Sequence, residues 1–175
     1  QRQGQLQARV VPPLHLPAGM QFNVVGALTW NSFPSLTNFD STTQEVRGHL
    51  SWRGVDHGAN LTLGVLNDHA LAQRPGGDRK GTYLNLLLRR HLGRGVNTEL
   101  GYSRQTWDSS RVYSPDVIEV VRDQTTQALR GSVSYPLNKQ HALVLEARLV
   151  RNRENISIFQ YNNRQLQLSW QWQLP

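Results

Sequence analysis

Histidines and their acidic neighbours are the residues of this chain best suited to catalysis or metal binding. Two of the six histidines follow an aspartate, in Asp56-His57 and Asp68-His69, and aspartate with histidine is a combination that hydrolytic sites use. Adjacent residues of a strand, however, point to opposite faces of a sheet. No second acidic pair matches the level of Asp68, and the histidines show no HExxH spacing. The sequence therefore predicts neither a catalytic residue nor a metal ligand.

The other chemical motifs are weak as well. The glycine pair of RPGGDRKG (74–81) lacks the strand–loop–helix context that a phosphate-binding loop requires. Basic residues accompany aromatic ones, but they are spread over alternate positions instead of being clustered, which argues against a nucleic-acid partner. The chain has no cysteine, so disulfides and thiolate metal sites are excluded. We expect no cofactor.

Composition limits the class of protein. The 175 residues are enough for one sizeable domain, and only 38% of them are hydrophobic. No apolar run reaches the 18 residues of a transmembrane helix, and no signal peptide is visible. The net charge is +7, and lysine occurs only at Lys80 and Lys139. Such a preference for arginine indicates fixed, hydrogen-bonded charges.

Alternation of apolar and polar residues is the dominant pattern of the chain. In QLQLSWQWQLP (165–175), leucine or tryptophan takes every second place, and glutamine or serine takes the places between. A period of two is typical of a β-strand with one apolar face. Nine segments alternate, and none has a helical period: 6–16, 20–30, 45–54, 59–65, 81–92, 96–102, 129–137, 141–150 and 165–175. The sequence predicts an all-β fold.

Connections between these segments alternate between short and long. The short ones are the turns LPAG, GVDHG, LGRG and LNKQ, which are rich in glycine, proline, aspartate and asparagine. The long ones are predicted as polar loops over 31–44, 67–80, 103–127 and 151–164. Bacterial outer-membrane barrels have short periplasmic turns and longer extracellular loops. The pattern therefore favours an antiparallel up-and-down transmembrane β-barrel.

Residue types on the two faces also favour a membrane barrel over a soluble one. Large aromatic residues gather near the ends of the apolar faces, where an interfacial girdle would lie: Trp30, Trp52, Tyr102, Tyr135, Trp170 and Trp172. Charged residues occupy the polar faces and are predicted to line the lumen: Arg9, Arg47, Arg53, Arg89, Glu99, Arg130, Glu146 and Arg148. A soluble ligand-binding β-barrel, with its apolar face inside, is the alternative.

Two motifs at the end of the chain resemble known families. The pattern Gln167-x-Ser169-x-x-Trp172-x-Leu174 resembles the C-terminal assembly signal of outer-membrane proteins, with Ser169 where glycine is usual and Pro175 after it. This resemblance implies recognition by the barrel-assembly machinery and a place in the Gram-negative outer membrane.

The stretch RNRENISIFQYNNRQLQLSWQW resembles the closing hairpin of barrels linked to tetratricopeptide repeats, such as the surface lipoprotein assembly modifiers. The matching residues are Asn155, Ile156, Tyr161, Asn162 and Arg164. The resemblance implies an outer-membrane component of an export or translocation system that passes or assembles a surface lipoprotein or an anionic polymer. Outer-membrane proteases carry Asp and His at their extracellular rim, so an outer-membrane hydrolase stays a lesser alternative, and we expect no enzyme.

The strand number leaves two possibilities open. A last strand that ends in the periplasm requires the strand at 6–16 to start on the extracellular side, whereas bacterial barrels generally have even strand numbers. Either this segment is not a membrane strand, as Pro12-Pro13 suggests, or further strands precede it. The resemblance favours residues 1–175 as the C-terminal part of a larger barrel.

The lumen is predicted to be positive, because the inward positions carry six arginines and two glutamates. A positive pore in a low-dielectric wall favours anions. The opposing possibility is that these arginines pair with Glu99, Glu146 and backbone carbonyls and plug a narrow lumen.

Overall fold

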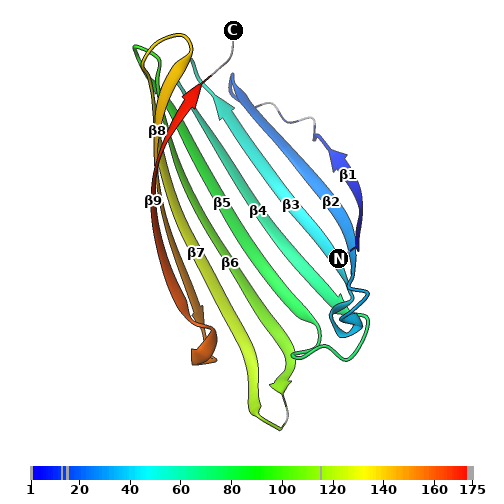
Figure 1. Ribbon diagram of the computed structural model, residues 1–175. Helices are drawn as coiled ribbons and strands as arrows, with labels where there is room; N and C mark the ends of the chain where they lie inside the picture. The colour runs from blue at the N-terminus through cyan, green and yellow to red at the C-terminus, as the bar shows by residue number, and fades with distance from the viewer. Residues whose placement is uncertain (1, 13, 15, 115, 173–175) are drawn as a thin grey trace.

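The chain forms one antiparallel sheet of nine strands in a computed structural model that describes residues 2–12, 14, 16–114 and 116–172. The strands lie in chain order, and each pairs with the next, which confirms the all-β, up-and-down prediction (Figure 1). They are β1 (Arg2–Val10), β2 (Met20–Ser32), β3 (Ser41–Arg53), β4 (His57–Ala70), β5 (Arg79–Leu92), β6 (Val96–Ser114), β7 (Ile118–Pro136), β8 (His141–Glu154) and β9 (Tyr161–Trp172).

Helical structure in the described residues is limited to two short 3-10 turns, η1 (Thr37–Phe39) and η2 (Ser157–Phe159). None of the described helices is long and apolar enough to cross a membrane.

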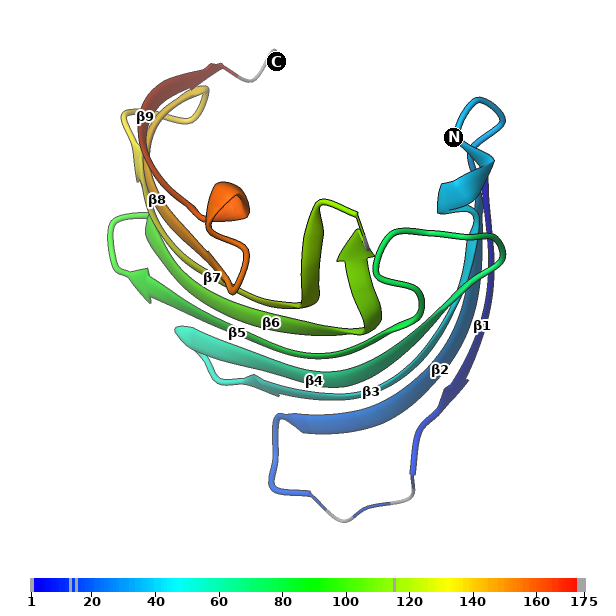
Figure 2. The same cartoon turned by 90° about the horizontal axis from the view of Figure 1, so that it is seen from below.

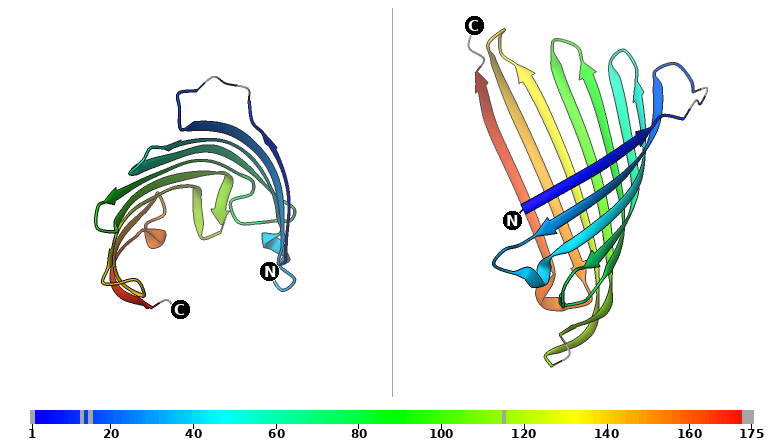
Figure 3. Two further views of the ribbon diagram at one scale, coloured as in Figure 1. Left: turned by 90° about the horizontal axis from the view of Figure 1, so that it is seen from above. Right: turned by 90° about the vertical axis from the view of Figure 1, so that its right-hand side faces the viewer.

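The sheet is strongly curved but open. Seen end-on, it forms an arc with β1 at one edge and β9 at the other (Figures 2 and 3). Within the described residues, β1 pairs only with β2 and β9 only with β8. The sheet therefore has a convex face, a concave face and two unpaired edges.

The two ends of the sheet differ in their connections. Short turns over 54–56, 93–95 and 137–140 lie at the end where β9 finishes, as predicted. In the tightest of them, Gly93, Arg94 and Gly95 all have positive φ, at 40°, 51° and 78°, and glycine is the residue that adopts this conformation at least cost. The connections over 33–40, 71–78 and 155–160 lie at the opposite end, which we call the long-loop end. The predicted short turn LPAG was wrong, because β1 ends at Val10 and β2 begins only at Met20.

Two predicted boundaries were wrong. The first strand covers Arg2–Val10 instead of 6–16, because Pro12 has no N–H for a ladder and the chain leaves the sheet before it. This strand is nevertheless paired with β2 over its whole length, so the described sheet has nine strands. The second error is the predicted loop at 103–127, most of which forms the outer parts of β6 and β7. Ladder hydrogen bonds do not require apolar side chains, so these strands continue where the alternation stops.

Candidate functional site

The concave face carries the polar residues of the sheet. The connection at 71–78, the tip of the β6–β7 hairpin and η2 all fold to the inside of the arc (Figure 2). Asp68, which bonds Arg74 of that connection, therefore lies on the concave face, and strand pairing extends this assignment across the sheet. Buried side chains of this face include Asn23, Asp68 and Asn152.

All eight residues predicted to line the lumen lie on the concave face, by strand alternation and register. Two cross-strand ion pairs join them: Arg89 to Glu99 at 2.9 Å, and Arg130 to Glu146 at 2.6 Å. Arg9, Arg53 and Arg148 have no carboxylate partner within 4 Å among the described residues.

Glu45 is a charged residue of this face that the sequence prediction omitted. It pairs with Arg47 on its own strand at 2.8 Å and accepts a hydrogen bond from the hydroxyl of Tyr83, two strands away. The Tyr83 ring lies over Gly64, where any side chain would collide with it. Glu45 therefore adds a third glutamate to the two predicted among the lumen-facing residues, and the net positive charge of that set is smaller than predicted.

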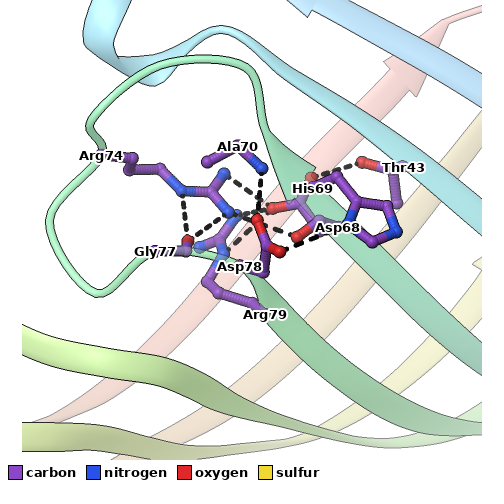
Figure 4. A network of polar contacts seen from close by, with 8 residues as sticks. All are labelled: Thr43, Asp68, His69, Ala70, Arg74, Gly77, Asp78 and Arg79. Atoms are coloured by element: carbon purple, nitrogen blue, oxygen red, sulfur yellow. Dashed lines mark hydrogen bonds and ion pairs between the residues drawn. The ribbon is translucent and has the colours of Figure 1, made fainter.

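Asp68 is the most buried charged group of the long-loop end, with 1% of its surface exposed. Arg74 and Arg79 each place a guanidinium nitrogen 2.7 Å from Asp68 Oδ2, and Thr43 donates to Oδ1 at 2.8 Å (Figure 4). Arg74 also donates to the carbonyl of Gly77 within the 71–78 connection. Its ion pair with Asp68 fastens this connection to the sheet. Burial alone would raise the pKa of Asp68, but these hydrogen bonds and charges outweigh it and hold the pKa below its ordinary value.

A second buried ion pair fastens the β6–β7 hairpin to η2. Arg122 donates to both oxygens of Glu154, at 2.7 and 2.8 Å, and its guanidinium lies 4.8 Å from the centre of the Phe159 ring. Asn152 donates to Glu154 and to the carbonyl of Phe159. Burial would raise the pKa of Glu154, but the bond and charge of Arg122 lower it overall. Three connections are thus held over the concave face at the long-loop end.

The opposite half of the concave face is open. A hollow of about 950 Å³ lies toward the short-turn end, lined chiefly by polar and charged side chains. Its lining includes Arg9, His49, Arg53, Arg89 and Glu99. Two of these arginines lack a carboxylate partner among the described residues, so the hollow carries uncompensated positive charge.

The convex face carries the six predicted girdle aromatics, again by strand alternation and register. Trp52, Tyr135, Trp170 and Trp172 lie near the short-turn end, and the ring of Trp170 stacks on His141 at 5.2 Å. Trp30 lies near the long-loop end. Tyr102 pairs with Leu86 in the middle of β5, and it is the last apolar residue of its strand face before Arg104.

Residues of the predicted assembly signal are only partly described. Gln167 and Ser169 are on the concave face of β9 and Trp172 is on the convex face, whereas Leu174 lies outside the described residues. Of the closing hairpin, Asn155 ties the hairpin to β7 by donating to the carbonyl of Val121, and Ile156 is buried.

The geometry of the Asp–His pairs offers little to hydrolysis. Asp68 is committed to two arginines, and His69 lies on the other face of β4, next to Asn67 and Asp78. Within the described residues, no three metal-ligating side chains come together.

Comparisons with family models, curated proteins and solved structures found no match.

Proposed function

We propose that this sheet is the wall of an outer-membrane β-barrel that serves in export, as the resemblance to repeat-linked barrels implies. The observation that carries the proposal is the distribution of residues over the two faces. Large apolar side chains are exposed on the convex face, among them Leu63, Leu145 and Leu168 at 50%, 45% and 69%. The concave face buries polar and charged side chains. A bilayer outside and water inside suit this arrangement, whereas a soluble barrel reverses it.

Unpaired sheet edges support closure by further strands. In hydrocarbon, each unsatisfied backbone N–H or C=O costs several kcal/mol. The open edges of β1 and β9 would present rows of such groups to lipid. In a bilayer this sheet therefore needs partner strands, and we propose that it is part of a larger, closed barrel.

Charge on the concave face supports an anionic cargo. The hollow at the short-turn end carries the unpaired Arg9 and Arg53, and outer-membrane barrels keep their short turns in the periplasm. An acidic lipoprotein, or an anionic polymer, would meet positive potential as it enters the barrel from the periplasm. Arginine suits such a cargo because its planar guanidinium group forms several hydrogen bonds at once to a carboxylate or a phosphate.

The membrane assignment is tested on the full-length protein expressed in a Gram-negative host. We expect it to sediment with outer membranes, to need detergent for extraction, and to migrate differently on a gel before and after boiling. A protein that purifies without detergent and migrates identically after boiling would instead be the soluble ligand-binding barrel.

The export assignment needs a separate measurement. In planar bilayers, the reversal potential under a salt gradient should indicate anion preference, and Arg53→Glu with Arg148→Glu should reduce or invert it. Leu63→Val on the convex face is the control that leaves pore charge unchanged. Cation preference in the unmodified protein would refute an anionic cargo while leaving the membrane assignment intact.

A further inference from the structure

Arginines also occur on the convex face. Arg90 lies toward the short-turn end, and four others lie on β6, β8 and β9, on the long-loop side of the apolar positions of their strands. Alternation and register place Arg104 of β6, Arg151 and Arg153 of β8, and Arg164 of β9 on this face. All four are exposed. They begin where the apolar positions of their strands end, next to Tyr102, Leu149 and Leu166. We call these four residues the convex arginine cluster.

Register brings the cluster together. Arg104 and Arg151 both pair with Gln127 of β7, so they are two strand spacings apart, roughly 10 Å. Arg164 pairs with Leu149, which makes it a diagonal neighbour of Arg151 at roughly 7–8 Å. Arg153 is two residues along β8 from Arg151. Arg104 and Arg164 are three strands apart, and Arg151 lies between them, so the four arginines form one continuous group on the face.

Ion pairs distinguish the arginines of the concave face from this cluster. Arg47, Arg89, Arg122 and Arg130 each form an ion pair with a glutamate on the concave face. Within the described residues, no member of the convex arginine cluster has a carboxylate within 4 Å. Asp108 and Asp123 lie on the same face farther along β6 and β7, where they pair with each other in register. The four guanidinium groups thus have no direct ion pair within the described residues, and an anion from outside the chain can bind them.

The chemistry of that anion follows from its surroundings. Guanidinium binds phosphate through two parallel N–H···O bonds, and several guanidinium groups together suit a group with more than one negative charge. The apolar residues directly below the cluster would contact acyl chains. A phosphate attached to acyl chains satisfies both surfaces, whereas free phosphate satisfies only one.

We propose that the convex arginine cluster binds the phosphates of a phosphorylated glycolipid in the outer leaflet. This proposal rests on the proposed membrane location, in which the long-loop end is extracellular. Gln127 and Asn162, which lie between the arginines in register, would donate further hydrogen bonds to the headgroup. Bound lipid would seal the barrel wall around β6–β9.

The test measures glycolipid that copurifies with the full-length protein in mild detergent, by mass spectrometry and phosphorus analysis. The variant Arg104→Gln, Arg151→Gln, Arg164→Gln should lose it, with affinity falling about tenfold for each arginine removed. The matched control Arg90→Gln, Arg94→Gln, Lys139→Gln removes the same charge at the short-turn end and should retain the lipid. Equal retention by both variants, or equal loss, would overturn the proposal.

A second arm needs no variant, so failure of the triple variant to fold leaves the proposal testable. Delipidated wild-type protein should bind the phosphorylated glycolipid and not its dephosphorylated form, and inorganic phosphate should not displace it. Equal binding of both forms, or displacement by inorganic phosphate, would overturn the lipid assignment. Heat-dependent migration, measured in parallel, reports the barrel itself, so a heat-modifiable protein without bound glycolipid refutes only the lipid site.

Discussion

A charge placed on the convex face of β5 should be far more damaging than the same charge placed one residue away. Leu86 is at the centre of the convex positions of β5, between Leu61 of β4 and Tyr102 of β6. The next convex charge toward the short-turn end is Arg90, four residues away, or roughly 13 Å along the strand. At a strand tilt near 45°, Leu86 therefore lies roughly 9 Å deeper in the bilayer than Arg90.

Leu86→Arg should therefore cost ~2–4 kcal/mol, the cost of arginine near the bilayer midplane. At about tenfold per 1.4 kcal/mol, the ratio of folded to unfolded protein falls roughly 30- to 700-fold. Asn85→Arg adds the same side chain on the concave face, where Asn85 is exposed and pairs with Thr62 and Ser103. It should change stability by less than about 1 kcal/mol.

The assay is urea titration of each full-length variant folded into phospholipid vesicles, followed by tryptophan fluorescence and by migration on unboiled gels. A lower midpoint for Leu86→Arg and an unchanged midpoint for Asn85→Arg are expected. The opposite ranking would mean that the convex face is the watery one, and equal small effects would mean that neither face meets lipid.

Three further outcomes follow from single contacts. Asp68→Asn should expose the 71–78 connection to protease, since removing one partner of a buried ion pair costs about 3–5 kcal/mol. Folding lowers the pKa of Asp68, so the wild-type connection should stay protected at neutral pH and open only as pH falls below 3.8, the ordinary pKa of an aspartate. Gly64→Val should displace the Tyr83 ring and lower the thermal midpoint, while Gly64→Val with Tyr83→Ala should recover part of the loss, as a double-mutant cycle would measure. Exchanging Ser169 with Trp170 keeps composition but moves an aromatic to the concave face, and should reduce surface exposure of the β6–β7 hairpin tip at 116–117 in intact cells, whereas normal exposure would show that register at β9 is not read.

The strands could be predicted from sequence because the two faces carry different classes of side chain over most of their length. Where both faces become polar, as in β6 beyond Tyr102, the alternation disappears, and a long loop was predicted in place of paired strands. The concave placement of Arg89 and Arg130 followed from alternation alone. Their partners did not, because which residue faces which across two strands depends on register, and a single sequence does not specify register.

The ion pairs of Asp68 also could not be predicted from the sequence. Asp68 drew attention as a possible catalytic residue because it precedes a histidine. Its structural partners, Arg74 and Arg79, were in the sequence as part of a glycine-containing loop, but only the closed connection brings them onto one carboxylate. A charged residue at a strand end followed by a loop with two arginines is the signal that could have indicated an anchor instead of a catalyst.

The two halves of the concave face differ in a way that affects how cargo would cross the barrel. At the short-turn end the hollow is open and positive. At the long-loop end, the ion pairs of Asp68 and Glu154 hold connections over the same face. An opening must separate both pairs, and leaving either carboxylate buried without its partner would cost about 3–5 kcal/mol. In the proposed export role, such an opening therefore requires the cargo or a partner to replace these contacts. An anionic cargo can do this for Arg74, Arg79 and Arg122, whose guanidinium groups would bind its carboxylates or phosphates, while Asp68 and Glu154 would become hydrated as the connections open.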